Sequence, residues 1–212
     1  MDDGHSSTGE PLGDDAPWEP WRPEEVASRF AGLTLRWYVV AGWALDLFRG
    51  EQTREHEDLE IAVASADFPM VQEALKGLEF DVVGSGERWH LDDPAFDEHF
   101  QTWVRDPATG VYHLDVFRDP HDGDTWICRR DHSIRMPYDD LVSFTPSGIP
   151  FMAPEVALLF KAKHMRVKDQ ADFDGVVPLL SDEQAAWLRD GLLRIHPGHP
   201  WIPALQEASR HR

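Results

Sequence analysis

The sequence of 212 residues predicts an α/β protein in which a short mixed sheet is flanked by helices and followed by a C-terminal helical region. Two observations predict this class. Short apolar and β-branched runs alternate with helix-type patterns as far as residue 128, and the pattern is helical from residue 154 onward. We therefore expect a disordered acidic tail at residues 1–17, a core at 18–150 and a helical region at 151–212.

The first half of the core combines helical patterns with two β-type runs. Pro23 suits the first turn of a helix, and Gly50 suits the end of another. In the second β-type run, apolar residues alternate with Asp58 and Glu60, so one face of the strand carries two acids. The expected elements are, in order, helix 20–31, strand 37–40, helix 43–48, strand 58–63 and helix 68–78.

The second half begins with strands and ends with helices. The turn-rich segment 106–110 lies between two β-type runs and predicts a hairpin. Residues 129–153 show no regular pattern and are expected to form a loop, and Pro154 then opens a long helix. The expected elements are strands 80–83, 100–104, 111–117 and 125–128, followed by helices 154–175, 182–193 and 203–208.

Composition limits the partners of the chain. Its formal charge of −19 would repel the phosphate backbone of a long nucleic acid and attract small cations and divalent metals. Cys128 is the only cysteine, which fits a reducing cytoplasm, and no stretch approaches the roughly 18 apolar residues of a membrane helix. We expect a cytoplasmic protein without a membrane partner; monomer and homodimer both stay open.

Three carboxylates are the candidate metal ligands. A strand would point Asp58 and Glu60 to the same side, about 7 Å apart at the backbone. Asp115 lies in another β-type run with apolar neighbours on both sides, so three acids from two strands could hold Mg²⁺, which prefers oxygen ligands. The alternative is that the pair consists of ordinary solvent-facing acids on an amphipathic strand.

Gly42 precedes the acid pair, at the point where the first β-type run gives way to a helix. Backbone N–H groups and the helix dipole favour phosphate at such a position, although a tight turn without a ligand is the alternative. The segments VAGWALD at residues 40–46 and TREHEDLEI at 53–61 resemble the nucleotidyltransferase signature of the DNA polymerase β superfamily. The resemblance is closest to the aminoglycoside and lincosamide nucleotidyltransferase branch, and it implies the nucleotidyltransferase fold.

The resemblance assigns roles to individual residues. It implies that Asp58, Glu60 and Asp115 are the catalytic, magnesium-binding acids, and that Asp115 or another carboxylate accepts the acceptor's proton. It also implies that the nucleotide is bound by Gly42, Trp43, Arg54, Lys161 and Lys168. The sequence departs from the family pattern at two positions, because Ala41 replaces the first glycine of the usual pair and Glu60 replaces the more common aspartate.

A cationic helix face supports the nucleotide site. In a continuous helix, Lys161, His164, Lys168 and Asp172 fall at i, i+3, i+7 and i+11 on one side, and the spacing also resembles the helix whose lysines meet the phosphates in this family. A solvated face with Lys168 paired to Asp172 is the alternative. Arg54 and His56 could approach phosphate, or could pair with Glu55, Glu57 or Asp46. His90, His99 and His113 show no metal-like spacing.

We therefore expect a nucleotidyltransferase whose active site lies between core and helical region. It would use Mg²⁺ and a nucleoside triphosphate, ATP, to transfer AMP to a hydroxyl of a small molecule, with an aminoglycoside or lincosamide antibiotic as the specific expectation. A toxin-like relative acting on tRNA or protein is one alternative, and a catalytically silent nucleotide-binding module is another. A metal-dependent hydrolase built on His56, Asp58 and His113 is the third.

Overall fold

The computed structural model describes residues 8–13 and 16–208 and divides the chain into two compact units. Unit 1 consists of the described residues of Met1–Trp37 and His56–Asp119. Unit 2 consists of Tyr38–Glu55 and the described residues of Pro120–Arg212. This division differs from the expected boundary at residue 150, because the segment 38–55 and the strands after residue 119 pack with the C-terminal helices.

Unit 1 contains a mixed sheet with the strand order β1-β5-β4-β6-β7-β3. Neighbouring strands from β1 to β7 are antiparallel, whereas β3 pairs with β7 in parallel, so the sheet is mixed as predicted. The predicted hairpin is β6–β7, and Gly110 in its turn has a φ of 74°, which favours glycine. The bounds are β1 Glu10–Pro11, β3 Glu60–Ala64, β4 Glu79–Gly84, β5 Glu87–His90, β6 Gln101–Arg105 and β7 Tyr112–Asp119.

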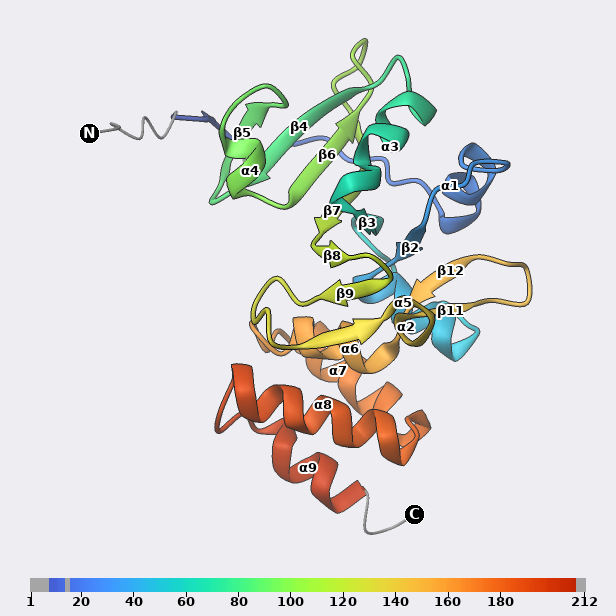
Figure 1. Cartoon of the computed structure of the whole chain (residues 1–212), viewed down its shortest axis with the longest axis vertical. Coiled ribbons are helices and arrows are strands. Elements are labelled where there is room, and N and C mark those ends of the chain that lie inside the picture. Colours follow the sequence, from blue (N-terminus) through green and yellow to red (C-terminus); the bar gives the residue numbers. More distant parts are fainter. Residues whose placement is uncertain (1–7, 14–15, 209–212) are drawn as a thin grey trace. The chain divides into compact units, whose positions relative to one another are not determined.

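Short helices accompany this sheet (Figure 1). Helix α1 begins at Pro23, and the backbone N–H of Arg22 donates to the Glu25 carboxylate at 2.8 Å, which fixes the start of the helix. Phe68 of α3 packs edge-on against Phe80 of β4 with ring centroids 5.9 Å apart, so this helix buries its apolar side on the sheet. The bounds are α1 Pro23–Arg29, the 3-10 helix η1 Ser65–Asp67, α3 Phe68–Ala74 and α4 Ala95–Glu98.

Part of the expected tail is ordered. Residues 1–7 and 14–15 lie outside the described residues, but Glu10–Pro11 form β1 against β5. The Glu10 carboxylate lies 2.7 Å from the Arg88 guanidinium, and the N–H of Leu12 donates to the carbonyl of Gly86. These local contacts give an acidic, glycine-rich segment a partner strand that its composition did not indicate.

Unit 2 combines two groups of paired strands with six α-helices among its described residues (Figure 1). Strand β12 pairs in parallel with β2 and antiparallel with β11, while β9 lies between β8 and β10. Much of the segment expected as a loop at 129–153 is therefore regular. The strand bounds are β2 Trp37–Val39, β8 His121–Asp122, β9 Thr125–Ile127, β10 Arg135–Pro137, β11 Val142–Phe144 and β12 Pro150–Met152.

Three helices of unit 2, at 41–49, 182–195 and 201–208, begin and end near the predicted residues, α5 lies in the segment expected as a loop, and the long helix predicted at 154–175 is the exception. Helix α2 ends at Gly50, whose φ of 77° closes it in the left-handed conformation, and Ser181 caps α8 through a bond from the N–H of Gln184. The bounds are α2 Ala41–Arg49, α5 Tyr138–Leu141, α6 Pro154–Lys161, α7 Val167–Val176, the 3-10 helix η2 Val177–Leu179, α8 Asp182–Ile195 and α9 Trp201–Ala208.

The exception is the long helix expected at 154–175, which is wrong. Helix α6 ends at Lys161 and α7 begins at Val167, and between them Met165 has a φ of 51°, which no α-helix tolerates. The i, i+3, i+7, i+11 face therefore does not exist as one helical stripe. The predicted α/β class is nevertheless confirmed. None of the helices in the described residues has the length and apolar character needed to cross a bilayer.

Candidate functional site

Two of the three predicted acids lie side by side on neighbouring strands of unit 1. Glu60 on β3 is the register partner of Asp115 on β7, and the N–H of Asp115 donates to the carbonyl of Leu59 at 2.9 Å. Strand β3 begins at Glu60, so Asp58 precedes the strand by two residues instead of lying on it. Both Asp58 and Glu60 are half-buried, whereas Leu59 is fully buried. The parallel pairing of β3 and β7 thus gathers the acids at one end of β3.

Asp115 occupies a dry and electronegative position. Its side chain is 2% exposed, and one carboxylate oxygen, Oδ2, accepts a 2.5 Å hydrogen bond from the Gln101 amide. The other oxygen, Oδ1, is buried and has no hydrogen-bond partner. Burial raises the pKa of Asp115 well above its usual value, and the nearby carboxylates of Glu60 and Asp58 raise it further, while Gln101 opposes the shift.

An aromatic cluster borders this position. Trp103 on β6 is the register partner of Asp115, and its buried indole N–H lies close enough to the Asp115 carboxylate to lower the pKa of that group. Trp18 lies edge-on against Trp103 at 5.0 Å and stacks on Tyr112 at 5.4 Å. The Asp115 carboxylate is therefore bordered by two side-chain donors, the Gln101 amide and the Trp103 indole, both of which lower its pKa.

His113 lies at a β-bulge and is held by contacts with the N-terminal segment. The register between β6 and β7 shifts so that Val104 faces Leu114 and Arg105 faces Tyr112, which leaves His113 as the extra residue of a bulge. Its Nδ1 lies 2.7 Å from the carbonyl oxygen of Glu19, and its ring stacks on a tryptophan of the N-terminal segment. These contacts count against a hydrolase that uses His113 as a metal ligand.

The chemistry of the three acids fits magnesium, although their oxygens are not gathered around one point. Within residues 8–13 and 16–208, no group of three or more His, Cys, Asp or Glu side chains is arranged tightly enough to hold a metal ion as it stands. The donor set nevertheless consists of carboxylate oxygens, which Mg²⁺ prefers, and Asp115 Oδ1 has unused acceptor capacity. A divalent cation would also offset the repulsion between the acids.

The predicted phosphate turn lies in unit 2, at the start of α2. Val40 is the N-cap residue of α2 and has no side-chain oxygen to cap the helix, so its first turn lacks a capping side chain. Ala41 has a φ of 55°, in the left-handed region that favours glycine, and Gly42 behind it is buried. The position where the family pattern has a glycine therefore keeps a glycine-like backbone despite its Ala side chain.

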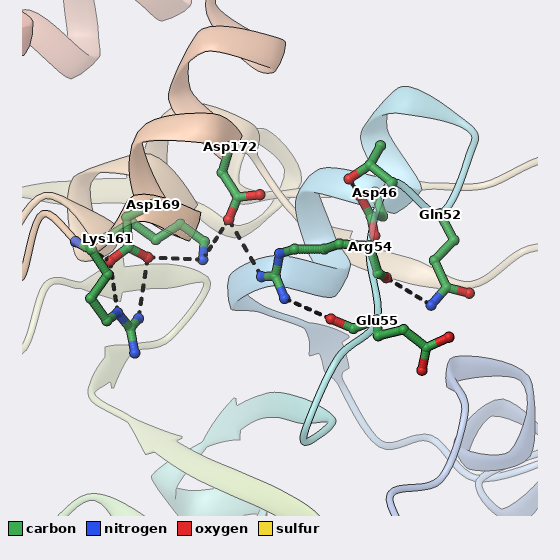
Figure 2. A network of polar contacts seen from close by, with 9 residues as sticks. Asp46, Gln52, Arg54, Glu55, Lys161, Asp169 and Asp172 are labelled. Carbon is green, nitrogen blue, oxygen red and sulfur yellow. Dashed lines mark hydrogen bonds and ion pairs between the residues drawn. The ribbon is translucent and has the colours of Figure 1, made fainter.

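The predicted cations Arg54 and Lys161 belong to one network in unit 2 (Figure 2). Lys161 Nζ lies 2.8 Å from Asp172 Oδ2, and Arg54 Nη2 lies 3.4 Å from the same oxygen. Arg54 thus pairs with Asp172, a partner that the sequence alternatives did not include. Lys168 lies in the first turn of α7 and is half-buried.

Three residues of these two environments were missed by sequence reasoning. Gln101 and Trp103 face Asp115 across the β6–β7 pairing, and Asp169 contacts Lys161 at 3.4 Å. The predicted hairpin was the available signal for the first two, because cross-strand partners follow once its register is known. For Asp169, the turn between α6 and α7 contains neither glycine nor proline. The turn, and with it the contact between Lys161 and Asp169, could therefore not be predicted from local residue types.

Comparison with known families matches one segment of the chain. Residues 24–111 match the model of the aminoglycoside-2''-adenylyltransferase family. The matched segment contains Gly42, Trp43, Arg54, Asp58 and Glu60, and it covers less than half of the chain. No curated protein matches the sequence.

Comparison with solved structures shows the same fold in two proteins. The lincosamide antibiotic adenylyltransferase LnuA, solved with lincomycin bound, is 18% identical with a TM-score of 0.52, and the match covers 78% of this chain and 96% of that one. The antibiotic-resistance factor ANT(2'')-Ia is 12% identical with a TM-score of 0.55, and the match covers 89% of this chain and 95% of that one. The chain therefore has the fold of these two proteins, and its residues 24–111 resemble the aminoglycoside-2''-adenylyltransferase family.

Proposed function

We propose that this enzyme transfers AMP from ATP to a hydroxyl group of an aminoglycoside or lincosamide antibiotic and releases pyrophosphate. The observation that carries the proposal is the pairing of Glu60 with Asp115, whose buried Oδ1 has no partner in the protein. Three carboxylates near one another are costly to fold without a cation, so their presence favours a function that uses one.

The carboxylates would hold the metal. Asp58, Glu60 and Asp115 are the residues we assign to Mg²⁺, which when bound would neutralise the triphosphate and orient it for attack. The acceptor oxygen forms a bond to the α-phosphorus, the bond from that phosphorus to the bridging oxygen breaks, and pyrophosphate leaves. The hydroxyl proton passes to a carboxylate, Asp115 or another acid of the site.

The groups of unit 2 would bind the phosphates. The first turn of α2 has no capping side chain, so the backbone N–H groups at Gly42 and Trp43 are suited to donate to phosphate oxygens. Arg54, Lys161 and Lys168 supply positive charge, which stabilises the charge that develops on the departing pyrophosphate. These assignments follow the family pattern and stay predictions for each residue.

Charge and likeness together favour an antibiotic acceptor. A net charge of −19 attracts polycationic aminoglycosides. One structural neighbour is described as a lincosamide adenylyltransferase and another as an antibiotic-resistance factor, so both acceptor classes belong in the test. The same acidity disfavours tRNA as an acceptor.

The test is a transfer assay on the full chain. Each of the four nucleoside triphosphates is incubated with protein, Mg²⁺ and a panel of aminoglycosides and lincosamides, while pyrophosphate and product mass are followed. We expect an adenylylated antibiotic with ATP, and no product after chelation of the metal. Absence of an adduct with every acceptor would rule out the antibiotic hypothesis, labelled tRNA or protein would support the toxin-like alternative, and ATP binding without pyrophosphate release would indicate a silent module.

A further inference from the structure

One carboxylate oxygen in unit 2 serves two cations that are far apart in the sequence. Asp172 Oδ2 on α7 lies 2.8 Å from Lys161 Nζ at the end of α6 and 3.4 Å from Arg54 Nη2 in the loop after α2 (Figure 2). Lys161 also lies 3.4 Å from Asp169 Oδ1. Asp172 is therefore the group through which Arg54 and Lys161 are held near each other.

The three side chains at the centre of this network are buried. The side chains of Lys161 and Asp172 are each 7% exposed, and that of Asp169 is fully buried. Ionised groups at such depth cost free energy unless they are paired, so the contacts fix the geometry. The network also includes Arg166, which lies 2.8 Å from Asp169.

Arg54 has a donor without an acceptor. Its Nη1 donates to the Glu55 carbonyl at 3.1 Å, and its Nη2 reaches Asp172 at the long distance of 3.4 Å. Its Nε is buried and has no hydrogen-bond partner. A guanidinium offers five N–H donors in one plane, suited to two oxygens of a phosphate. A purely structural ion pair would leave no buried donor idle, because an unsatisfied buried N–H is costly.

The loop that carries Arg54 is anchored independently of its side chain. Thr53 Oγ1 donates to the buried carboxylate of Asp46 on α2 at 2.6 Å, and the Gln52 amide donates to the carbonyl of Arg54 at 2.9 Å (Figure 2). These bonds fix the backbone at residues 52–54, while the Arg54 guanidinium is held by the Glu55 carbonyl and by Asp172. Of these two partners, Asp172 is the one that also contacts Lys161.

We propose that Asp172 is a positioning residue for the phosphate subsite, which holds Arg54 and Lys161 so that both meet one polyphosphate anion. This inference rests on the proposed function, because it assigns the anion as the triphosphate of the nucleotide. Asp172 itself would not touch the phosphates, since two anions repel. Its action is to keep two cations together whose mutual repulsion would otherwise turn Arg54 toward solvent.

The experiment measures binding of inorganic tripolyphosphate to the full chain by calorimetry, with neither metal nor acceptor present. We expect Asp172→Asn to weaken binding at least tenfold, because the cations lose their shared partner, and Asp172→Glu to recover part of the loss. The matched control is Asp174→Asn on the same helix, since the Asp174 carboxylate accepts a hydrogen bond from Gln170 at 2.7 Å. This control should bind as the unaltered chain does.

A second pair of measurements separates positioning from mere stabilisation. Asp169→Asn also removes a partner of Lys161 but keeps the bridge to Arg54, so it should lower the unfolding temperature with less effect on tripolyphosphate affinity. In the transfer assay, Asp172→Asn should raise KM for ATP about tenfold and change kcat by less than threefold. Should Asp172→Asn fail to fold, the NMR signal of Arg54 Nε–H in the unaltered chain must still shift when tripolyphosphate is added.

The outcomes are distinguishable. Equal or tighter tripolyphosphate binding by Asp172→Asn would overturn the positioning role and leave the proposed transfer reaction standing. Equal losses for Asp172→Asn and Asp169→Asn would also overturn it, because a general loss of the network would then explain both. An unaltered chain that binds neither tripolyphosphate nor ATP would overturn the phosphate subsite and the proposed function together.

Discussion

The buried charged groups of unit 1 and those of unit 2 have opposite electrostatic surroundings. In unit 1, the buried Asp115 has the carboxylates of Glu60 and Asp58 nearby, and these raise its pKa. In unit 2, the buried Lys161 has two carboxylates as counterions at 2.8 and 3.4 Å. The first region gathers like charges, and the second gathers opposite charges. A protein folds the second arrangement at little cost, whereas it retains the first only when function requires it.

The difference predicts what each region does when its ligand is absent. The network of unit 2 is held together by its own acids, so the cations are positioned before a nucleotide binds. The acids of unit 1 repel one another, so they gain most from a cation that joins them. Substitutions in the two regions should therefore change activity and stability in different proportions.

The largest effect is expected for the acids of unit 1. Asp58→Asn and Glu60→Gln should each lower kcat/KM for the proposed adenylyl transfer at least about a thousandfold, on the order of 4 kcal/mol, because each would remove a proposed metal ligand. Circular dichroism should show an unchanged fold. Glu55→Gln is the control, since the exposed Glu55 uses its backbone carbonyl, not its carboxylate, to bind Arg54. Activity retained in either acid variant would refute the metal assignment.

The next effect concerns stability in unit 2. Lys161→Met should lower the free energy of unfolding by about 3 kcal/mol, because the buried Asp169 and Asp172 would lose a shared cation. Urea denaturation measures the change. Lys163→Met, an exposed residue just after α6, should stay within about 0.5 kcal/mol of the unaltered chain. An unchanged free energy of unfolding for Lys161→Met would show that Asp169 and Asp172 do not depend on Lys161 as their counterion.

The opposite sign is expected for Asp115 in the absence of metal. Asp115→Asn should raise the metal-free stability by on the order of 1 kcal/mol, because it removes a buried charge beside Glu60 and Asp58 while Gln101 can still donate to the Asn oxygen. Thermal unfolding with Mg²⁺ or with a chelator measures this. Magnesium should raise the unfolding temperature of the unaltered chain and leave the variant almost unchanged. A destabilised variant would show that the charge on Asp115 is already compensated.

Sequence reasoning succeeded where the signals were local. The β6–β7 hairpin followed from the turn residues at 106–110, and the end of α2 followed from Gly50. The break between α6 and α7 was missed because Lys163, His164 and Met165 are acceptable helix residues, and Met165 adopts a positive φ without any glycine to announce it. Tertiary packing overrode local propensity there.

Long-range contacts account for the rest. The Arg54–Asp172 pair joins residues 118 positions apart, and no periodicity in the chain connects them. The parallel pairing of β3 with β7 is equally non-local. The prediction that Asp115 lies beside Glu60 depended on the resemblance to a known family more than on any strand pattern. The types of residue in each site were predictable from sequence, whereas the partner of each charge was not.

The smallest effect tests the departure from the family pattern at Ala41. Its φ of 55° costs a residue with a side chain about 1–2 kcal/mol, and glycine would avoid this strain but lose more entropy on folding. Ala41→Gly should therefore raise the free energy of unfolding by about 0.5 kcal/mol, measured in urea. Ala44→Gly, a buried position inside the same helix, should lower it by about 1 kcal/mol. Because Ala41 already has the backbone conformation of a glycine, KM for ATP should not change in Ala41→Gly; a lower KM would show that the methyl group hinders the phosphates.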